Sequence, residues 1–246
     1  MNFTRGFTLI EMAIVLLIIT LLLSGLLVPL STQVEQRKIA ETQKTLEEIK
    51  EALLGFAIAN GRLPCPAIAT SSGVEDPLPP STSTTIKSCT SALSGFVPAV
   101  TLGISPTDDQ GFAIDGWGHR IRYAVTNANN SRVTTTDGIQ TLGMGTFSPD
   151  LHVCASSIGV TASACGPPGN TNTLTATAPA LIYSLGRNWA TGGTGADEAE
   201  NLDADEVFVS HVPSPATAPG GEFDDIVVWL SPNILFSRML AAGKLP

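Results

Sequence analysis

The sequence Gly-Phe-Thr-Leu-Ile-Glu at residues 6–11 opens an apolar run that continues to Leu30. No charged residue occurs between Met12 and Leu30. As a helix, the segment from Phe7 to Leu30 would extend roughly 36 Å, which is enough to cross the hydrocarbon core of a bilayer. The run therefore predicts a membrane-spanning helix at the N-terminus.

The N-terminal segment differs from an ordinary secretory signal. A signal peptide has an apolar core of only about 7–15 residues and ends at a small-residue cleavage site. This run is longer and lacks such a site. In addition, Glu11 is a carboxylate in an apolar helix, where a charge is costly and usually has a function and a partner. The alternative is a plain anchor that places Glu11 near the lipid headgroups.

The pattern closely resembles the N-terminus of type IV prepilins and type II secretion pseudopilins, in which a short leader ending in Gly precedes Phe-Thr-Leu-Ile-Glu and a long apolar helix. The resemblance implies that a prepilin peptidase cuts between Gly6 and Phe7 and methylates the new amino group of Phe7. It implies a leader at 1–6, a transmembrane and filament-core helix at 7–30, and a globular domain at 31–246. The expected location is the bacterial inner membrane, crossed once, with the globular domain in the periplasm until the subunit joins a filament.

Glu11 has an expected role in assembly. Cleavage would leave the amine of Phe7 as a cation with no side-chain partner of its own, and the carboxylate of Glu11 can pair with such an amine on a neighbouring subunit. Burying either charge alone in an apolar bundle is costly, so pairing would select one register between helices. The expected partners are the prepilin peptidase, other pilin or pseudopilin subunits and an inner-membrane assembly platform.

Composition limits the functions open to the rest of the chain. The protein has 246 residues and a formal net charge of −9, and it shows no basic stripe of the kind that nucleic-acid-binding proteins carry. Nucleic-acid binding is therefore not expected as the main task. Neither a G-x-S-x-G nor an H-E-x-x-H motif is present, and no two carboxylates are marked as a hydrolytic site. We do not expect an enzyme.

The chain has four cysteines, Cys65, Cys89, Cys154 and Cys165. An oxidising compartment would favour disulfides, and four cysteines allow three pairings. Proximity favours Cys65–Cys89 and Cys154–Cys165. Zinc is the competing interpretation, but no C-x₂-C pair exists.

The predicted fold class is α+β and resembles the pilin fold. Residues 31–60 form an amphipathic helix whose apolar stripe consists of Ile39, Leu46, Ile49, Leu53 and Phe56. A loop-rich region follows at 61–111, and then a sheet with loops at 112–246. We expect the helix to pack on an antiparallel sheet with strands near 120–125, 151–155, 181–186, 207–212 and 226–230. A short C-terminal helix at 234–242 would begin after Ser231 and Pro232 and face the sheet through Leu235, Met239 and Ala242.

The segment Asp-Gly-Trp-Gly-His at 115–119 is similar to the Asp-Pro-Trp-Gly-Asn turn that leads into a long strand in major pseudopilins. Two of its five positions depart from that pattern, so the match is partial. We interpret Trp117 as a core aromatic that anchors the turn and His119 as a turn residue.

An acidic segment at 197–206 is the one candidate for a metal site. Six of its side chains are carboxylates and none is basic, and a hard cation would relieve their repulsion. The preceding residues 183–188 resemble the Ser-Leu-Gly loop that holds calcium in several major pseudopilins. The ligands expected from this resemblance are Asp197 and either Asp203 or Asp205, with a carbonyl of Leu185 or Asn188. The alternative is a solvated acidic loop without a metal.

The expected function is that of a structural subunit, which is cleaved, methylated and assembled into a type IV pilus or a type II secretion pseudopilus. The length and the two cysteine pairs favour a minor subunit over a major one. The alternative is a tip adhesin or a DNA- or ligand-binding minor pilin whose long loops 66–95 and 127–180 contact a partner.

Overall fold

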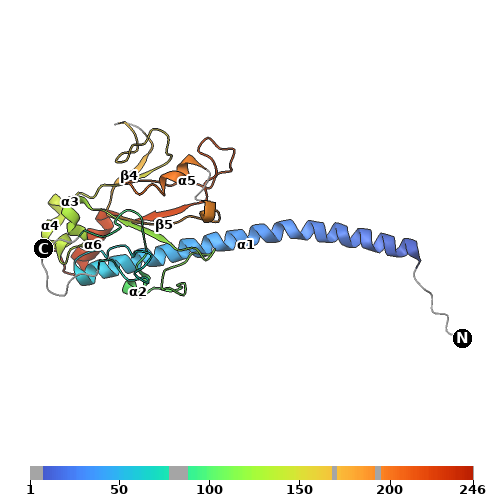
Figure 1. Cartoon of the computed structure of the whole chain (residues 1–246), viewed down its shortest axis with the longest axis horizontal. Coiled ribbons are helices and arrows are strands. Elements are labelled where there is room, and N and C mark those ends of the chain that lie inside the picture. The colour runs from blue at the N-terminus through green and yellow to red at the C-terminus, as the bar shows by residue number, and fades with distance from the viewer. Residues whose placement is uncertain (1–7, 78–87, 168–170, 192–194, 246) are drawn as a thin grey trace. The chain divides into compact units, whose positions relative to one another are not determined.

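The computed structural model describes residues 8–77, 88–167, 171–191 and 195–245. The chain divides into two compact units, Met1–Glu41 and Thr42–Pro246. Helix α1 (Leu9–Asn60) contributes residues to both units (Figure 1). The expected leader at 1–6 and the expected cleavage site at Gly6 and Phe7 lie outside the described residues.

The first unit consists of the N-terminal part of α1. All side chains from Thr8 to Leu21 are exposed, and Leu9 is 91% exposed. Within the described residues, no helix combines the length and the hydropathy that a membrane span requires. The expected transmembrane helix at 7–30 is therefore not shown by the structure.

The second unit contains an antiparallel sheet of four strands in the order β1-β2-β5-β7. These strands are β1 (Gly95–Phe96), β2 (Arg122–Val125), β5 (Ala180–Ser184) and β7 (Ile226–Trp229). The register places Ser184 opposite Ile226, so the residues that come after β5 and those that precede β7 lie at the same end of the sheet.

One face of this sheet packs against helices. The apolar stripe of α1 is confirmed within this unit, because Leu46, Ile49 and Leu53 are fully buried in the cluster that includes Tyr123 and Ile182 of the sheet. Helix α6 (Pro232–Ala241) joins the same cluster through Leu235, Phe236 and Met239. The expectation for Ala242 is wrong, because the helix ends at Ala241 and Ala242 is exposed.

A second sheet covers part of the opposite face. Its order is β4-β3-β6, with β3 and β6 parallel, and its strands are β3 (Leu151–Cys154), β4 (Thr173–Ala178) and β6 (Val207–Val209). Val153 and Phe208 pack with Leu181 and Tyr183 of the first sheet, and the rings of Tyr183 and Phe208 are 5.4 Å apart. Strand β4 was not expected from the sequence, and neither was the parallel pairing.

The connections contain short helices where the sequence pattern predicted loop. They are α2 (Ala99–Leu102), α3 (Ala128–Ser131), η1 (Arg132–Thr134), α4 (Gly138–Thr146), η2 (Trp189–Thr191) and α5 (Ala196–Glu200). The region 61–111 is therefore not all loop, since it holds β1 and α2. The acidic segment is likewise not all loop, because its first four residues belong to α5.

Two disulfides are present, Cys65–Cys89 and Cys154–Cys165, which is the pairing that proximity favours. The first closes a segment that comes after α1, and the second closes the loop that comes after β3. Both disulfides therefore constrain long connections that contain few apolar residues.

Candidate functional site

Glu11 lies at the start of α1 and contacts Thr8. The backbone N–H and the hydroxyl of Thr8 donate to Glu11 Oε2 over 2.7 and 2.8 Å, and the N–H of Glu11 donates to the Thr8 hydroxyl over 3.3 Å. This reciprocal pair is a capping box, in which a Thr before the helix and a Glu three residues later satisfy backbone donors that lack helical partners. The spacing Thr-x-x-Glu is visible in the sequence but was not interpreted as a cap.

The turn at 115–119 is organised by a buried carboxylate. Asp115 Oδ1 accepts hydrogen bonds from the N–H groups of Trp117 and His119, each over 2.9 Å. Its Oδ2 accepts a hydrogen bond from the hydroxyl of Ser184 on β5 over 2.6 Å. Asp115 thus fixes the turn to the end of β5. Trp117 is only half-buried, so the interpretation as a core aromatic is wrong, whereas His119 is a turn residue as expected.

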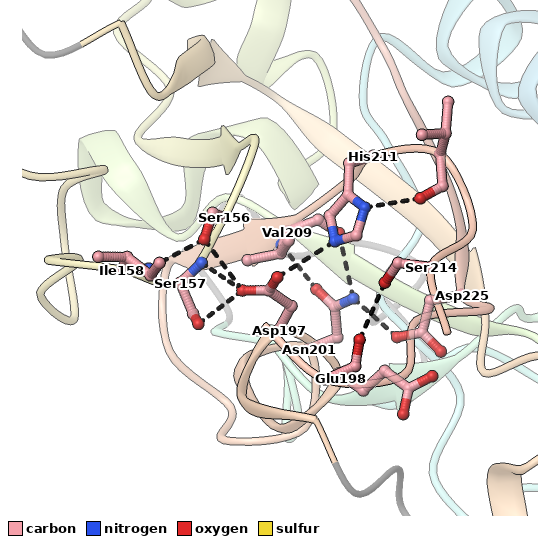
Figure 2. A network of polar contacts seen from close by, with 12 residues as sticks. Ser156, Ser157, Ile158, Asp197, Glu198, Asn201, Val209, His211, Ser214 and Asp225 are labelled. Carbon is pink, nitrogen blue, oxygen red and sulfur yellow. Dashed lines mark hydrogen bonds and ion pairs between the residues drawn. The ribbon is translucent and has the colours of Figure 1, made fainter. Parts of the chain in front are cut away.

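Asp197 of α5 accepts hydrogen bonds from two other segments. Its Oδ1 accepts from the N–H and the hydroxyl of Ser157, both over 2.6 Å, and from the hydroxyl of Ser156 over 3.3 Å. Its Oδ2 lies 3.2 Å from Nε2 of His211. Figure 2 shows Asp197 between these residues, which come from the segment after β3 and the segment after β6.

His211 is held from both sides of its ring. Nδ1 lies 2.7 Å from the carbonyl oxygen of Val212 and Nε2 faces Asp197, and the ring stacks on Phe223 with centroids 3.9 Å apart. Hydrogen bonds from Ser157 and the charge of His211 lower the pKa of Asp197, despite burial that acts to raise it. The hydrogen bonds of Asp197 therefore connect α5 to the segment after β3 and to the segment after β6.

A second carboxylate group combines Glu198 of α5 with Asp224 and Asp225, which precede β7. One oxygen from each side chain lies within 4.8 Å of those of the other two. The amide of Asn188 donates to both oxygens of Glu198 over 3.0 and 3.1 Å, and the amide of Asn201 donates to Asp225 Oδ2 over 2.7 Å. Glu198 and Asp225 are buried, so three carboxyl side chains share one small volume.

The electrostatics of this group are unfavourable without a cation. Burial raises the pKa of Asp225 to about 8, and burial together with the charge of Glu198 raises the pKa of Asp224 to about 6. Asp224 Oδ1 is buried and has no hydrogen-bond partner among the described residues. Gly186 packs directly against it, because a Cβ on this glycine would lie 2.0 Å from that oxygen. An orphaned carboxylate oxygen beside two further carboxylates fits a hard divalent cation.

Glu200, Asp203 and Asp205 form a third carboxylate group, with one oxygen from each within 4.8 Å of the others. Burial and neighbouring carboxylates raise the pKa of Glu200 to about 7 and that of Asp205 to about 6. Asp203 is exposed. Water reaches this group, so its mutual repulsion is screened more than that of the buried group.

Among the described residues, the structure brings together only two of the metal ligands expected from the sequence, Asp203 and Asp205. Asp197 belongs to the network with His211, Asp203 and Asp205 belong to the group with Glu200, and Asn188 presents an amide N–H to Glu198. The buried group instead uses Asp224 and Asp225, which were not expected as metal ligands. The pairing of β5 with β7 brings them beside the segment that comes after β5.

Residues 1–27 match the prokaryotic N-terminal methylation motif, the signature of type IV pilins and pseudopilins. The motif supports a pilin-like or pseudopilin subunit that a prepilin peptidase processes and that assembles with other such subunits. It points to a structural subunit and not to an enzyme. Comparison with curated proteins and with solved structures gave no match.

Proposed function

We propose that the chain is a minor subunit of a type IV pilus or a type II secretion pseudopilus and that it lies at or near the filament tip. The observation that carries the proposal is the methylation motif at residues 1–27. The minor role is supported by the elaboration of the second unit, which has a second sheet stacked on the first and two disulfide-closed segments. Such additions suit a subunit used in few copies better than one that must repeat closely along a filament.

The exposed apolar surface of α1 supports a filament core. Side chains such as Leu9, Leu17 and Leu21 are more than half exposed. Each exposed Å² of apolar surface costs about 25 cal/mol in water, so a long apolar stretch needs a cover. In the proposed function the bilayer covers residues 7–30 before assembly, and neighbouring subunits cover them afterwards. The disulfides agree with a globular domain in an oxidising periplasm.

Glu11 has two successive roles in this proposal. In the isolated subunit it caps α1 through Thr8. In the filament its carboxylate would pair with the methylated amine of Phe7 on a neighbouring subunit. Bringing the two charges into an apolar bundle carries a desolvation cost that only their pairing offsets, so the ion pair would select one register between neighbouring helices.

A calcium ion at Glu198, Asp224 and Asp225 is part of the proposal. The orphaned Asp224 Oδ1 and the two buried carboxylates support it, as does the raised pKa of Asp225. The ion would supply positive charge at the end of the sheet where β5 and β7 meet. The ion would thereby stabilise the C-terminal part of the fold, and its role would be structural and not catalytic.

The second candidate is a tip adhesin or a DNA- or ligand-binding subunit. It is favoured by the disulfides Cys65–Cys89 and Cys154–Cys165, which close parts of the segments 66–95 and 127–180, because a closed loop keeps its shape when it meets a partner. Binding of a surface or nucleic-acid ligand by the full chain, compared with binding of sister subunits, separates this candidate from a scaffold.

The experiment that tests the proposal is intact-mass measurement of the protein from native membranes, with and without the prepilin peptidase. We expect loss of Met1–Gly6 together with one added methyl group, and only when the peptidase is present. Quantification in sheared filaments should then give few copies relative to the main subunit. An unprocessed chain, or a cut near Ser24, would contradict the subunit assignment, and a copy number equal to the main subunit would contradict the minor role.

A further inference from the structure

A pocket of about 380 Å³ lies at the β1 edge of the four-stranded sheet. Its lining includes Phe96 of β1, Arg122 of β2, His119 and Arg120 from the turn before β2, and Trp189 of η2. The volume is in the range of small-ligand sites, which are commonly about 300–1,000 Å³. The lining of the pocket includes none of the side chains of the carboxylate groups described above.

The sheet register explains why the pocket is open. Phe96 is opposite Arg122, and Arg122 is opposite Tyr183, so the three side chains form one row on the same face. The second sheet covers the Tyr183 end of the row through Phe208. Phe96 and Arg122 remain only half-buried, and the row therefore continues from the core into the pocket.

Arg122 brings an unbalanced positive charge to this row. Its guanidinium lies 4.8 Å from the centroid of the Phe96 ring, and its Nη1 donates to the carbonyl oxygen of Ser94 over 3.1 Å. It forms no ion pair with any residue in the described part of the chain. An arginine has five N–H donors, so the guanidinium can donate further hydrogen bonds to a ligand in the pocket.

Arg120 differs from Arg122 in that its charge is balanced. Its Nε donates to Asp108 Oδ2 over 2.6 Å, and its Nη2 donates to the side chain of Gln110 over 2.7 Å. Its guanidinium also lies 4.2 Å from the centroid of the Phe112 ring. The lining carries one acidic side chain, Asp108, against the two arginines. The pocket therefore has a net positive charge on a chain whose formal net charge is −9.

The other walls are flat and aromatic. Trp189 is 50% exposed, and its ring centroid lies 4.8 Å from that of His119. His119 Nδ1 lies 3.0 Å from the carbonyl oxygen of Gly186, which holds the ring in place. Phe96 contributes a further ring next to Arg122. Flat rings beside a guanidinium favour a ligand that is apolar and planar next to its charge.

We propose that this pocket binds a carboxylate attached to a flat apolar group. Arg122 pairs with the carboxylate, because a guanidinium matches the geometry of two carboxylate oxygens. Trp189 and Phe96 contact the flat group. Two sources have this chemistry, a free aromatic acid and a protein segment with an acidic residue beside an aromatic one. The inference goes beyond the proposed function and does not depend on it.

The test is ligand-observed NMR titration of the full chain in detergent, with a detergent blank subtracted. Benzoate is the first probe and benzamide is its neutral match. We expect benzoate to bind at least tenfold more tightly than benzamide. Arg122→Gln should remove that preference, whereas Arg238→Gln, on an exposed arginine of α6, should leave it unchanged. In a second arm, tighter binding of the capped dipeptide Ac-Phe-Asp-NH₂ than of benzoate identifies a protein source, and the reverse order identifies a free acid.

Asp108→Asn is a variant that should strengthen the binding of benzoate, whereas Arg122→Gln should weaken it. Asp108→Asn keeps the Oδ1 acceptor for the N–H groups of Gln110 and Phe112 but removes the counter-charge of Arg120, so benzoate should bind several-fold more tightly. Trp189→Ala removes a ring that contacts the flat group and should weaken the binding of benzoate. This variant tests the proposal even if Arg122→Gln does not fold. Equal binding of benzoate and benzamide, tighter binding of inorganic phosphate than of benzoate, or equal effects of Arg122→Gln and Arg238→Gln would each overturn the proposal.

Discussion

The side chains of Thr8 and Glu11 each accept a hydrogen bond from the other residue's backbone N–H at the start of α1. The Thr8 N–H donates to Glu11 Oε2 over 2.7 Å, and the Glu11 N–H donates to the Thr8 hydroxyl. The carboxylate that pairing with a neighbouring amine would require is therefore already used as a helix cap. A glutamine also serves in a capping box but carries no charge. This difference allows the two roles to be separated.

Glu11→Gln should be cleaved like the unchanged protein but should enter filaments at least tenfold less, because the neutral amide cannot compensate a buried amine. Thr8→Ala is the matched variant that weakens the cap and keeps the charge, and it should assemble. The measurement is the fraction of each variant in sheared filaments relative to membranes. Normal assembly of Glu11→Gln would show that assembly does not need the charge of Glu11.

Arg62 and Glu75 form a buried ion pair with two contacts of 2.7 Å. Glu75 Oε2 also accepts a hydrogen bond from the N–H of Cys65, so the pair fixes the disulfide-closed segment next to the end of α1. Glu75→Gln leaves a buried guanidinium without its counter-ion and should lower the free energy of unfolding by about 3–5 kcal/mol.

Urea unfolding of the full chain, followed by tryptophan fluorescence, checks this prediction. The double variant Arg62→Met with Glu75→Leu should lose less than Glu75→Gln, since no buried charge remains. Glu48→Gln, in the exposed pair with Lys44, should change the free energy by no more than about 0.5 kcal/mol. A cost for Glu75→Gln as small as that of Glu48→Gln would contradict the prediction.

The two disulfides close loops of different length, with sequence separations of 24 for Cys65–Cys89 and 11 for Cys154–Cys165. In the chain-entropy description, each stabilises by about 3 kcal/mol and the longer loop by somewhat more. Replacing both cysteines of a pair by serine should therefore cost more for the first pair. Urea unfolding of the two double variants measures the difference, and a larger loss for the Cys154–Cys165 pair would contradict the entropic explanation.

The sequence predicted elements whose burial follows a regular period. Leu46, Ile49 and Leu53 recur at helical spacing and are all buried. Strand β4 (Thr173–Ala178) was missed although threonine alternates with leucine and alanine along it, because it is mostly exposed and lies within the long segment 127–180 that was expected to be loop. The backbone hydrogen bonds with β3 hold this segment as a strand, and this pairing cannot be predicted from the local sequence pattern.

The candidate site was predictable only in part, because its members are far apart in the chain. Glu198 lies in the segment that was expected to bind a cation, but Asp224 and Asp225 reach it through the pairing of β5 with β7. That register is a tertiary feature that single-sequence patterns do not contain. Asp197 and Glu198 are neighbouring carboxylates in the same acidic segment, so the sequence does not distinguish them. Only the structure shows that Asp197 contacts His211 and is not part of the carboxylate group of Glu198.

Calcium should raise the thermal stability of the second unit. An ion that binds only the folded state at about 100 times its Kd stabilises it by about 2.7 kcal/mol, so the Tm of the full chain should rise by several degrees in calcium relative to EDTA. Asp224→Asn should remove most of the rise, whereas Asp203→Asn, in the exposed group, should keep it. Equal loss in both variants, or no rise in the unchanged protein, would contradict a site at Glu198, Asp224 and Asp225.

In EDTA, stability should fall as the pH rises, and Asp225 is the reason. Burial raises its pKa to about 8 in the folded chain, compared with about 3.9 in an unfolded chain, so the folded state binds the proton more tightly. The stabilisation is complete below about pH 4 and is lost as the pH rises towards about 8. Melting curves between about pH 5 and pH 8 should thus show a falling Tm, and Asp225→Asn should flatten the slope because an amide does not titrate. A Tm that rises over this interval, or an unchanged slope in Asp225→Asn, would show that Asp225 is already ionised in the folded chain.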